Sequence, residues 1–149
     1  MPDPPFMYER VRSEHQFIAC QTIRRVVFTE EQGIKAAEDH DGYDNSAIHV
    51  LVTLQSRMVG TGRVYQDEEG QGHIARIAVL KAFRGLGVGK RIVQELEKYA
   101  RSAGMQSVYL NPHLHLLEFY GRMGYIAVPG SEHQVNEHQL IRMTKTFSE

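Results

Sequence analysis

The sequence contains a single cysteine, Cys20, among its 149 residues. One cysteine excludes an intramolecular disulfide and also excludes zinc sites built from paired cysteines. No apolar run approaches the roughly 18 residues that a membrane span needs, so no membrane partner is expected. The first six residues lack the charged and apolar regions of a signal peptide, which together with the single cysteine favours a cytoplasmic protein.

The chain also lacks an excess of charge of either sign. Lys and Arg total 17 against 18 Asp and Glu, giving a formal net charge of −1. Such a chain has no overall attraction for nucleic acid, so no nucleic-acid partner is expected. Its 42% hydrophobic and 23% charged residues are typical of one globular domain. We expect a single domain over 1–149, with a short flexible N-terminal tail at 1–6.

Two kinds of pattern organise the first half of the chain. Ser13 and Gln16 form an S-x-x-Q capping box ahead of apolar residues at three- and four-residue spacing, which predicts a helix over 14–28. The polar, glycine-interrupted segment 30–44 predicts a loop or a frayed helix. Runs of β-branched and apolar residues predict three antiparallel strands, over 49–54, 58–65 and 73–80.

In the second half the apolar period changes from two to about 3.6, which predicts a helix from Val88 to Ala103 that stops at Gly104. Because a helix separates the third and fourth strands, those two strands can lie parallel. The sequence therefore predicts an α/β fold with a mixed sheet. The remaining expected elements are a strand at 107–110, a short helix at 113–123, a strand at 125–128, a polar loop at 129–137 and a closing strand at 138–147.

The segment that joins the third strand to the long helix carries the most chemical information. Its residues, Arg84-Gly-Leu-Gly-Val-Gly89, place three glycines where the helix begins. Free N–H groups at a helix N-terminus attract anions, and glycine lets phosphate oxygens reach the main chain. Six basic residues against two acidic ones over 81–101 add local positive charge. These features predict a pyrophosphate site.

Two nucleotide-binding motifs fit this loop poorly. A P-loop needs G-x-x-x-x-G-K-[ST], but Arg84 replaces its first glycine and Arg91 replaces its hydroxyl residue. A dinucleotide fingerprint needs G-x-G-x-x-G at the first strand of a parallel fold, whereas the spacing here is G-x-G-x-G after antiparallel strands. A glycine turn that only caps a core helix remains an alternative.

The acyl-CoA motif [QR]-x-x-G-x-[GA] fits better, because Arg84, Gly87 and Gly89 match it behind an apolar strand. Here the sequence resembles the GNAT superfamily of acyl-CoA-dependent N-acyltransferases. The run 116–125 is similar to the fourth helix of that family, in which an aromatic–tyrosine pair precedes a glycine and an aromatic residue. The resemblance covers nearly the whole chain, and 25–33 looks like a subgroup of small bacterial members of uncertain substrate.

The resemblance implies a GNAT-type α/β fold with a mixed, mostly antiparallel sheet, a splayed central strand pair and flanking helices. It also implies acetyl-CoA as cosubstrate, no metal, and an amine acceptor, and it allows a homodimer. The implied cofactor-binding residues are Ile77, Ala78 and Val79 beside the pantetheine arm, and Arg84, Gly85, Leu86, Gly87, Val88 and Gly89 around the pyrophosphate.

Catalytic roles also follow from the resemblance. A main-chain N–H of Val79 or its neighbour would polarise the thioester carbonyl, and Tyr120 would protonate the departing thiolate. The alternative for Tyr120 is a packed aromatic side chain. The sequence does not identify the general base, for which Glu31 is the first candidate. It belongs to the acidic segment 30–44, whose carboxylates could also simply solvate a loop.

The histidines and Cys20 offer weaker signals. His113 and His115 are the next candidates for the base, and without cysteine partners we expect them to hold no metal. His49, His73 and His138 are expected to be hydrogen-bonded strand residues, and Cys20 a small buried hydrophobic residue.

The expected function is transfer of an acetyl group from acetyl-CoA to a primary amine by direct attack. The acidic segment 30–44 has six carboxylates opposed in the sequence only by Lys35, which favours a small cationic amine or a peptide amine as acceptor. A non-catalytic acyl-CoA-binding sensor is the main alternative, and a purely interacting scaffold is a third possibility.

Overall fold

The computed structural model describes residues 5–148. Seven strands form one sheet in the order β1-β2-β3-β4-β5-β9-β6, and two more form a separate hairpin. The strands are β1 Met7–Arg10, β2 Ile48–Leu54, β3 Arg57–Gln66, β4 Gly72–Val79, β5 Ser107–Leu110, β6 Ile126–Ala127, β7 His133–Val135, β8 His138–Leu140 and β9 Met143–Thr146. The helical segments are α1 Glu14–Arg24, η1 Arg25–Glu31, α2 Ala36–Asp39, η2 Asp44–Ser46, η3 Lys81–Phe83, α3 Val88–Ser102, η4 Leu114–Leu116 and α4 Leu117–Arg122.

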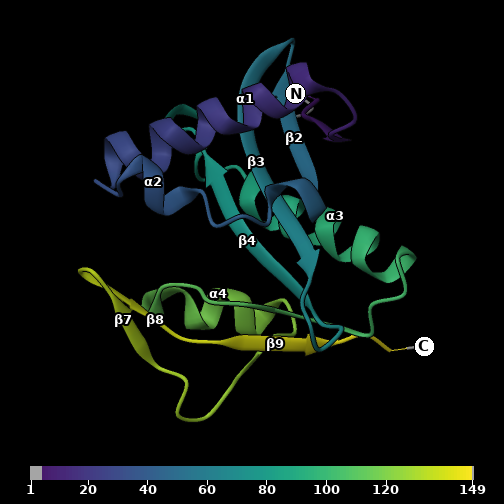
Figure 1. Ribbon diagram of the computed structural model, residues 1–149, viewed down its shortest axis with the longest axis vertical. Helices are drawn as coiled ribbons and strands as arrows, with labels where there is room; N and C mark the ends of the chain where they lie inside the picture. Colours follow the sequence, from purple (N-terminus) through teal and green to yellow (C-terminus); the bar gives the residue numbers. More distant parts are fainter. Residues whose placement is uncertain (1–4, 149) are drawn as a thin grey trace.

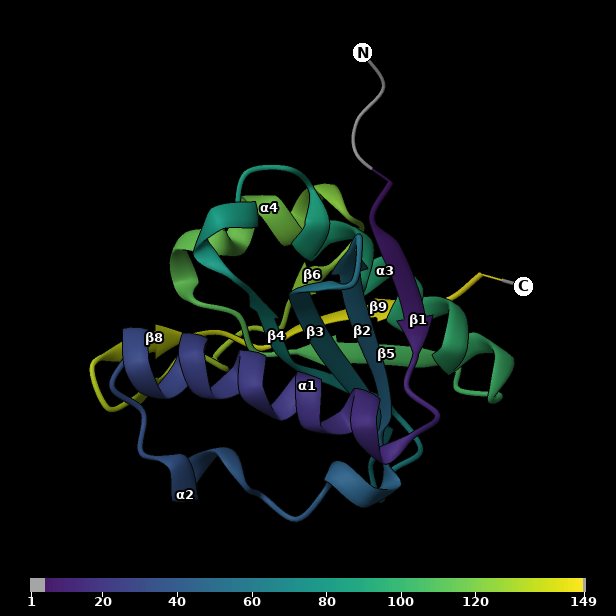
Figure 2. The same ribbon diagram turned by 90° about the horizontal axis from the view of Figure 1, so that it is seen from above.

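The helices cover both faces of the sheet. Figure 1 shows α1 crossing in front of the long central strands, and Figure 2 shows α3 and α4 on the opposite side of those strands from α1. Residues of α3 bury their apolar side chains against the sheet: Val88, Ile92, Leu96 and Ala100 are at most 2% exposed. The predicted stripe is therefore confirmed at these four positions, whereas Ala103 is exposed. This layered arrangement confirms the predicted α/β class.

The three predicted antiparallel strands are confirmed as β2, β3 and β4. β4 and β5 are parallel, and they pair only where Gly72 and His73 meet Val108 and Tyr109. Beyond this point β4 continues to Val79 while β5 turns away. A register shift opposite β4 and the positive φ of Arg76 mark a bulge, which bends a strand. The predicted splayed strand pair is therefore present.

The first helix begins where the sequence predicts. The Ser13 side chain accepts a hydrogen bond from the Gln16 N–H, and the Gln16 side chain accepts one from the Arg12 N–H, so donors at the helix start are satisfied. The helical path does not end at Phe28 but continues to Glu31, and from Arg25 onward it has π geometry. Periodicity does not reveal this change because the wider turn keeps the backbone helical.

Further segments differ, wholly or in part, from what the sequence predicts. The polar loop expected over 129–137 contains β7, which pairs with β8 around Asn136. The single closing strand expected over 138–147 is divided into β8 and β9, which belong to different sheets. The segment 30–44, predicted as a loop or a frayed helix, contains the end of η1, the four-residue helix α2 and the start of η2 between loop residues, so this prediction is confirmed in part. β1 was not predicted, because its short, largely exposed sequence shows no alternation of apolar residues.

The predicted N-terminal tail lies partly outside the described residues, which exclude 1–4. Phe6 packs its ring edge-on against Phe83, with the centroids 6.2 Å apart. Cys20 is fully buried, as predicted. Within 5–148, no helix is both long enough and apolar enough to cross a membrane.

Candidate functional site

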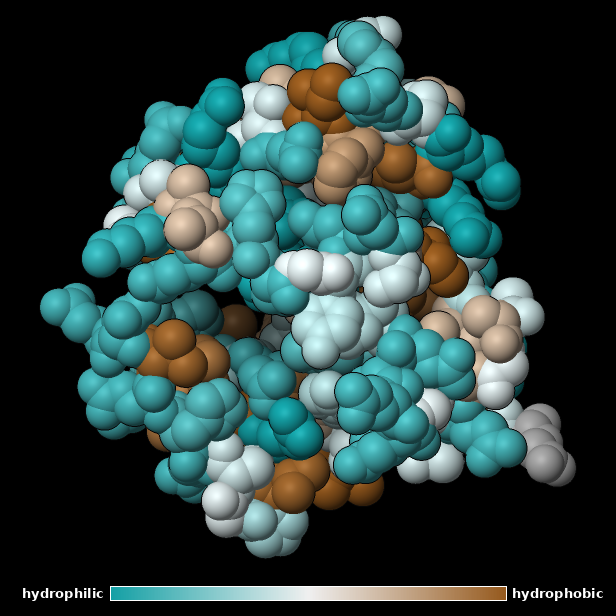
Figure 3. Space-filling model, in the orientation of Figure 1, coloured by the Kyte–Doolittle hydropathy of each residue, from teal (hydrophilic) through white to brown (hydrophobic). Residues whose placement is uncertain are grey.

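A cleft of about 950 Å³ runs along β4. Figure 3 shows the surface hollowed between α2 and the hairpin formed by β7 and β8. One end of the cleft reaches the glycine loop at the start of α3, and we call it the cofactor end. The other end, which we call the acceptor end, lies between η1 and α2 on one side and the β7–β8 hairpin on the other. The splay between β4 and β5 opens the space between these two ends.

The open edge of β4 carries main-chain groups that no strand pairs. The Leu80 N–H donates to the Val59 carbonyl oxygen at 2.8 Å, so this group of Leu80 faces β3. Because neighbouring residues in a strand point their main-chain groups to opposite edges, the N–H of Val79 faces the edge that β5 leaves open. The predicted donor to the thioester oxygen is therefore directed toward the cleft.

The glycine loop has the backbone expected of a site that binds anions through N–H groups. Gly85 and Gly87 have φ of +80° and +81°, a conformation that L side chains rarely adopt. A Cβ atom at either position would meet no atom within 4 Å, so packing does not require glycine there. Gly87 is the N-cap of α3, whose first N–H groups have no partner within the helix. These groups are free to bind a phosphate.

The structure gathers most of the predicted cofactor-binding residues. Leu86 is the exception, because it is 59% exposed and does not line the cleft. Arg84 does line the cleft, and its guanidinium donates from Nε to the Val79 carbonyl at 2.9 Å. The other predicted residues in the cleft lining are Ile77, Ala78, Val79, Gly85, Gly87, Val88 and Gly89.

Tyr120 lies on α4 and lines the same cleft. Its side chain is 8% exposed, and burial raises the pKa of its hydroxyl. Its ring packs edge-on against Phe119 and Tyr125. Among the described residues, no group forms a hydrogen bond with the Tyr120 hydroxyl, so that group is available to a ligand. The packed ring and the free hydroxyl are compatible, so the predicted role stays a prediction.

Glu31 lies beside the glycine loop and outside the cleft lining. Its carboxylate accepts a hydrogen bond from Arg84 Nη2 at 2.6 Å, and both side chains are partly exposed. The structure thus brings the predicted base to the predicted phosphate ligand. This contact neutralises part of the charge that Arg84 would offer a pyrophosphate.

The acidic segment is paired with three arginines that are distant in sequence. Asp39 binds Arg24 and Arg76, with N–O distances of 3.0 and 2.9 Å. Asp44 binds Arg24 at 2.9 Å and Arg63 at 2.7 Å. The expectation that only Lys35 opposes this acid is therefore wrong for these carboxylates. Sequence reasoning missed the arginines because they come from α1, β3 and β4.

Asp41 completes this ion-pair network, which we define as Arg24, Arg63 and Arg76 with Asp39, Asp41 and Asp44. Partial burial alone would raise the pKa of Asp41, but hydrogen bonds from Arg63 lower it to about 2. Arg63 is fully buried, so a carboxylate must accompany it. The network fixes the segment 39–44 against β3 and β4.

His73 lies where β4 and β5 begin to separate, and it lines the cleft. Its Nδ1 is 2.7 Å from the Tyr65 hydroxyl, and its ring stacks on Tyr109 at 4.5 Å. Burial, reinforced by nearby arginines, lowers its pKa to about 4. The expected hydrogen-bonded strand histidine is confirmed here.

His113 and His138 also line the cleft, with their ring nitrogens 3.0 Å apart. Burial and the neighbouring histidines lower the pKa of His113, which favours its neutral form. His115 is next to His113, at 5.6 Å between ring centroids, but does not line the cleft. Within the described part of the chain, no three His, Cys, Asp or Glu side chains are grouped to hold a metal ion.

Comparisons with known proteins agree with this geometry. The family model of the acetyltransferase (GNAT) family matches residues 17–125. Over 114 residues the chain is 35% identical to the uncharacterized N-acetyltransferase YjcF of Bacillus subtilis (strain 168), covering 76% of this chain and 81% of that protein.

Solved structures share the fold. An acyl-CoA N-acyltransferase from Pseudomonas aeruginosa superimposes with a TM-score of 0.81 at 24% identity, covering 95% of this chain and 99% of that one. A Bacillus subtilis acetyltransferase in complex with CoA gives a TM-score of 0.72 at 12% identity, with 97% and 100% coverage. The sequence match and the fold lead to one conclusion: this chain belongs to the GNAT acetyltransferase family.

Proposed function

We propose that this protein transfers an acetyl group from acetyl-CoA to a primary amine by direct attack of the amine on the thioester. The main observation that supports this proposal is that one cleft joins the open edge of β4 to the glycine loop of α3. The edge over 77–79 offers main-chain groups to a pantetheine arm. The loop over 84–89 offers N–H groups to a pyrophosphate. The residues present therefore fit the cosubstrate.

We assign a group of the cleft to the negative charge that develops on the carbonyl oxygen and to the proton that the thiolate needs. The amine nitrogen attacks the carbonyl carbon, and the carbon–sulfur bond breaks as the amide forms. The Val79 N–H would donate to the oxygen that becomes negative, the arrangement that stabilises such intermediates. The Tyr120 hydroxyl would give its proton to the thiolate, since its raised pKa keeps it protonated at neutral pH.

The amine must lose a proton to become nucleophilic, because an alkyl ammonium has a pKa near ~10.4. Glu31 was the first candidate for this step, yet it binds Arg84 outside the cleft lining. His113 lines the cleft, and its lowered pKa favours the neutral form that a base requires. We therefore propose that His113, directly or through water, takes the proton, and that Glu31 positions Arg84.

The decisive experiment is thiol release from acetyl-CoA in the presence of primary amines. Tyr120→Phe removes the hydroxyl and is expected to lower kcat by roughly 10²–10⁴, the range of a lost general acid, with the KM for acetyl-CoA unchanged. Tyr99→Phe makes the same change on a half-buried tyrosine of α3 and is expected to match the wild type. Wild-type turnover by Tyr120→Phe would assign that residue to packing alone.

The same experiment distinguishes an enzyme from an acyl-CoA sensor. Acetyl-CoA binding measured by calorimetry, without thiol release for any amine, would favour the sensor. We expect both binding and release, because Tyr120 has a hydroxyl free of other partners in the described structure.

A further inference from the structure

The acceptor end of the cleft carries little net charge. The charged residues that line it are Glu38, Asp39 and Arg76. Asp39 is already paired with Arg76 and with Arg24, and the ion-pair network holds Asp41 and Asp44 away from the lining. Glu38 is thus left as the one carboxylate of this lining that no described cation neutralises. A single carboxylate matches one ammonium group.

Glu38 lies at the mouth of the cleft, and its side chain reaches from α2 to the β7–β8 hairpin. It lies on α2, and its Oε2 accepts a hydrogen bond from Asn136 Nδ2 at 3.4 Å across the opening. Asn136 is at the turn between β7 and β8. The contact is long and exposed, so it leaves the carboxylate able to accept stronger hydrogen bonds from an ammonium group.

The lining on either side of this carboxylate offers apolar side chains and, among the described residues, no further free carboxylate, although Gln32, His133 and Asn136 add polar groups. Phe28 and Ile34 line one side, and Val135 and Leu140 of the hairpin line the other. Val135 is 47% exposed, which leaves an apolar surface directed at the cleft without a partner. A second ammonium group placed between these walls would be desolvated with no carboxylate to receive it. An alkyl or aryl group would instead bury apolar surface there.

From this charge count and these walls we infer that the acceptor is a primary monoamine with an apolar body, recognised by Glu38, rather than a polyamine or an aminoglycoside. The inference rests on the proposed acetyl transfer and narrows its acceptor. Glu38 is a binding residue in this assignment. It holds the ammonium form on entry, and the nitrogen loses its proton deeper in the cleft.

Two amines of equal size provide the test. Hexylamine and 1,5-diaminopentane have the same number of heavy atoms. Hexylamine ends in a methyl group where 1,5-diaminopentane has a second amine. In thiol-release assays at saturating acetyl-CoA, kcat/KM is expected to be at least about tenfold higher for hexylamine. The reason is that the second ammonium group of 1,5-diaminopentane would lie against the apolar side chains with no carboxylate to bind it. Equal values, or a preference for the diamine, would overturn the monoamine assignment.

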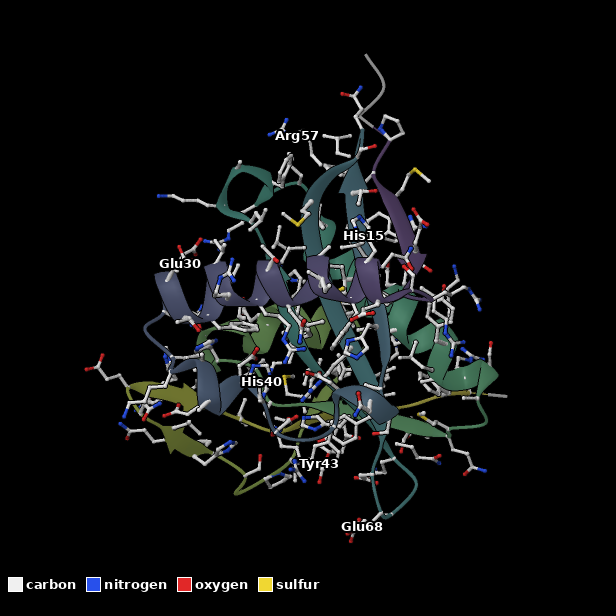
Figure 4. All side chains as sticks on the ribbon, turned by 45° about the horizontal axis from the view of Figure 1, so that its top comes forward. His15, Glu30, His40, Tyr43, Arg57 and Glu68 are labelled. Carbon is white, nitrogen blue, oxygen red and sulfur yellow. The ribbon has the colours of Figure 1, made fainter. Side chains whose placement is uncertain are left out.

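Variants of two glutamates test the role of Glu38. Glu38→Gln is expected to raise the KM for hexylamine about tenfold while the KM for acetyl-CoA stays unchanged. Glu30→Gln makes the same charge change at an exposed position that does not line the cleft, and Figure 4 shows Glu30 projecting from the end of η1. If both variants behave alike, Glu38 does not recognise the amine.

Val135→Ser tests the apolar wall at an exposed site where folding is not at risk. It is expected to raise the KM for hexylamine severalfold and to leave the KM for methylamine, which lacks an apolar body, unchanged. An equal effect on both amines would contradict the wall assignment. Failure of the underlying transferase proposal looks different: acetyl-CoA binds in calorimetry, yet no primary amine, peptide amine or polyamine releases thiol. Thiol release with a polyamine but not with hexylamine would overturn the monoamine assignment alone.

Discussion

Acidification is expected to destabilise the fold through His73. Burial, with the charges of Arg63, Arg142 and Arg76, lowers the pKa of this histidine from 6.5 to about 4. As the pH falls below about 6.5, the unfolded chain binds a proton at this position and the folded chain does not. The free energy of unfolding should therefore be unaffected by His73 above pH 6.5 and fall by about 1.4 kcal/mol per pH unit down to pH 4. The accumulated loss is about 3 kcal/mol.

Urea unfolding from pH 7 to pH 4 measures this loss. Other groups titrate over the same range, so the relevant quantity is the difference between wild type and His73→Gln at each pH. His73→Gln should lower stability at pH 7, because the hydrogen bond between residue 73 and Tyr65 changes, but its pH dependence should be weaker by about 3 kcal/mol.

A control isolates the buried histidine. His40→Gln removes an exposed histidine, labelled in Figure 4, and should leave the wild-type pH dependence intact. Parallel curves for wild type and His73→Gln from pH 6.5 to 4 would refute the reasoning, since they would mean that folding does not suppress protonation of His73.

Three further predictions concern the loop, the network and the base. Gly87 and Gly104 lie at opposite ends of α3, both at positive φ and with open space around an added Cβ atom. Gly87→Ala and Gly104→Ala should therefore each lower the free energy of unfolding by about 1–2 kcal/mol, but only Gly87→Ala should weaken acetyl-CoA binding in calorimetry. Asp44→Ala leaves two buried arginines short of a partner and should cost about 3–5 kcal/mol in urea unfolding; a cost below 1 kcal/mol would contradict this. Glu31→Gln should change the KM for acetyl-CoA and spare kcat, whereas His113→Asn should lower kcat; the reverse pattern would restore Glu31 as the base.

The fold was predictable where the signal is local. The capping box at Ser13, the stripe of α3 and the β-branched and apolar runs of β2 to β4 depend on neighbouring residues, and each appears within a few residues of the expected position. The signal for the glycine loop is local as well, because consecutive residues determine both the positive φ angles and the start of the helix. The resemblance to a family then supplied the splay of β4 and β5, which no periodicity shows.

The acidic segment shows what local reasoning cannot reach. Within 30–44 the sequence offers only Lys35 as a cation, so sequence reasoning leaves these carboxylates unpaired. Folding brings in Arg24, Arg63 and Arg76 from three other elements. A buried arginine in a strand resembles any exposed arginine in the sequence, since its burial depends on which segment covers it. The acceptor end of the site was therefore the least predictable part.

The ion-pair network links the stability of the fold to the choice of acceptor. Arg63 and Arg24 are buried, so the chain must supply carboxylates to them or lose several kcal/mol. Meeting that requirement with Asp39, Asp41 and Asp44 withdraws those acids from any role in attracting a polycation. Glu38, one residue before this set, is not part of the network because its carboxylate lies in the cleft lining and contacts Asn136 instead. The residues that hold the segment in place thus also reduce the charge of the acceptor end to that of a single carboxylate.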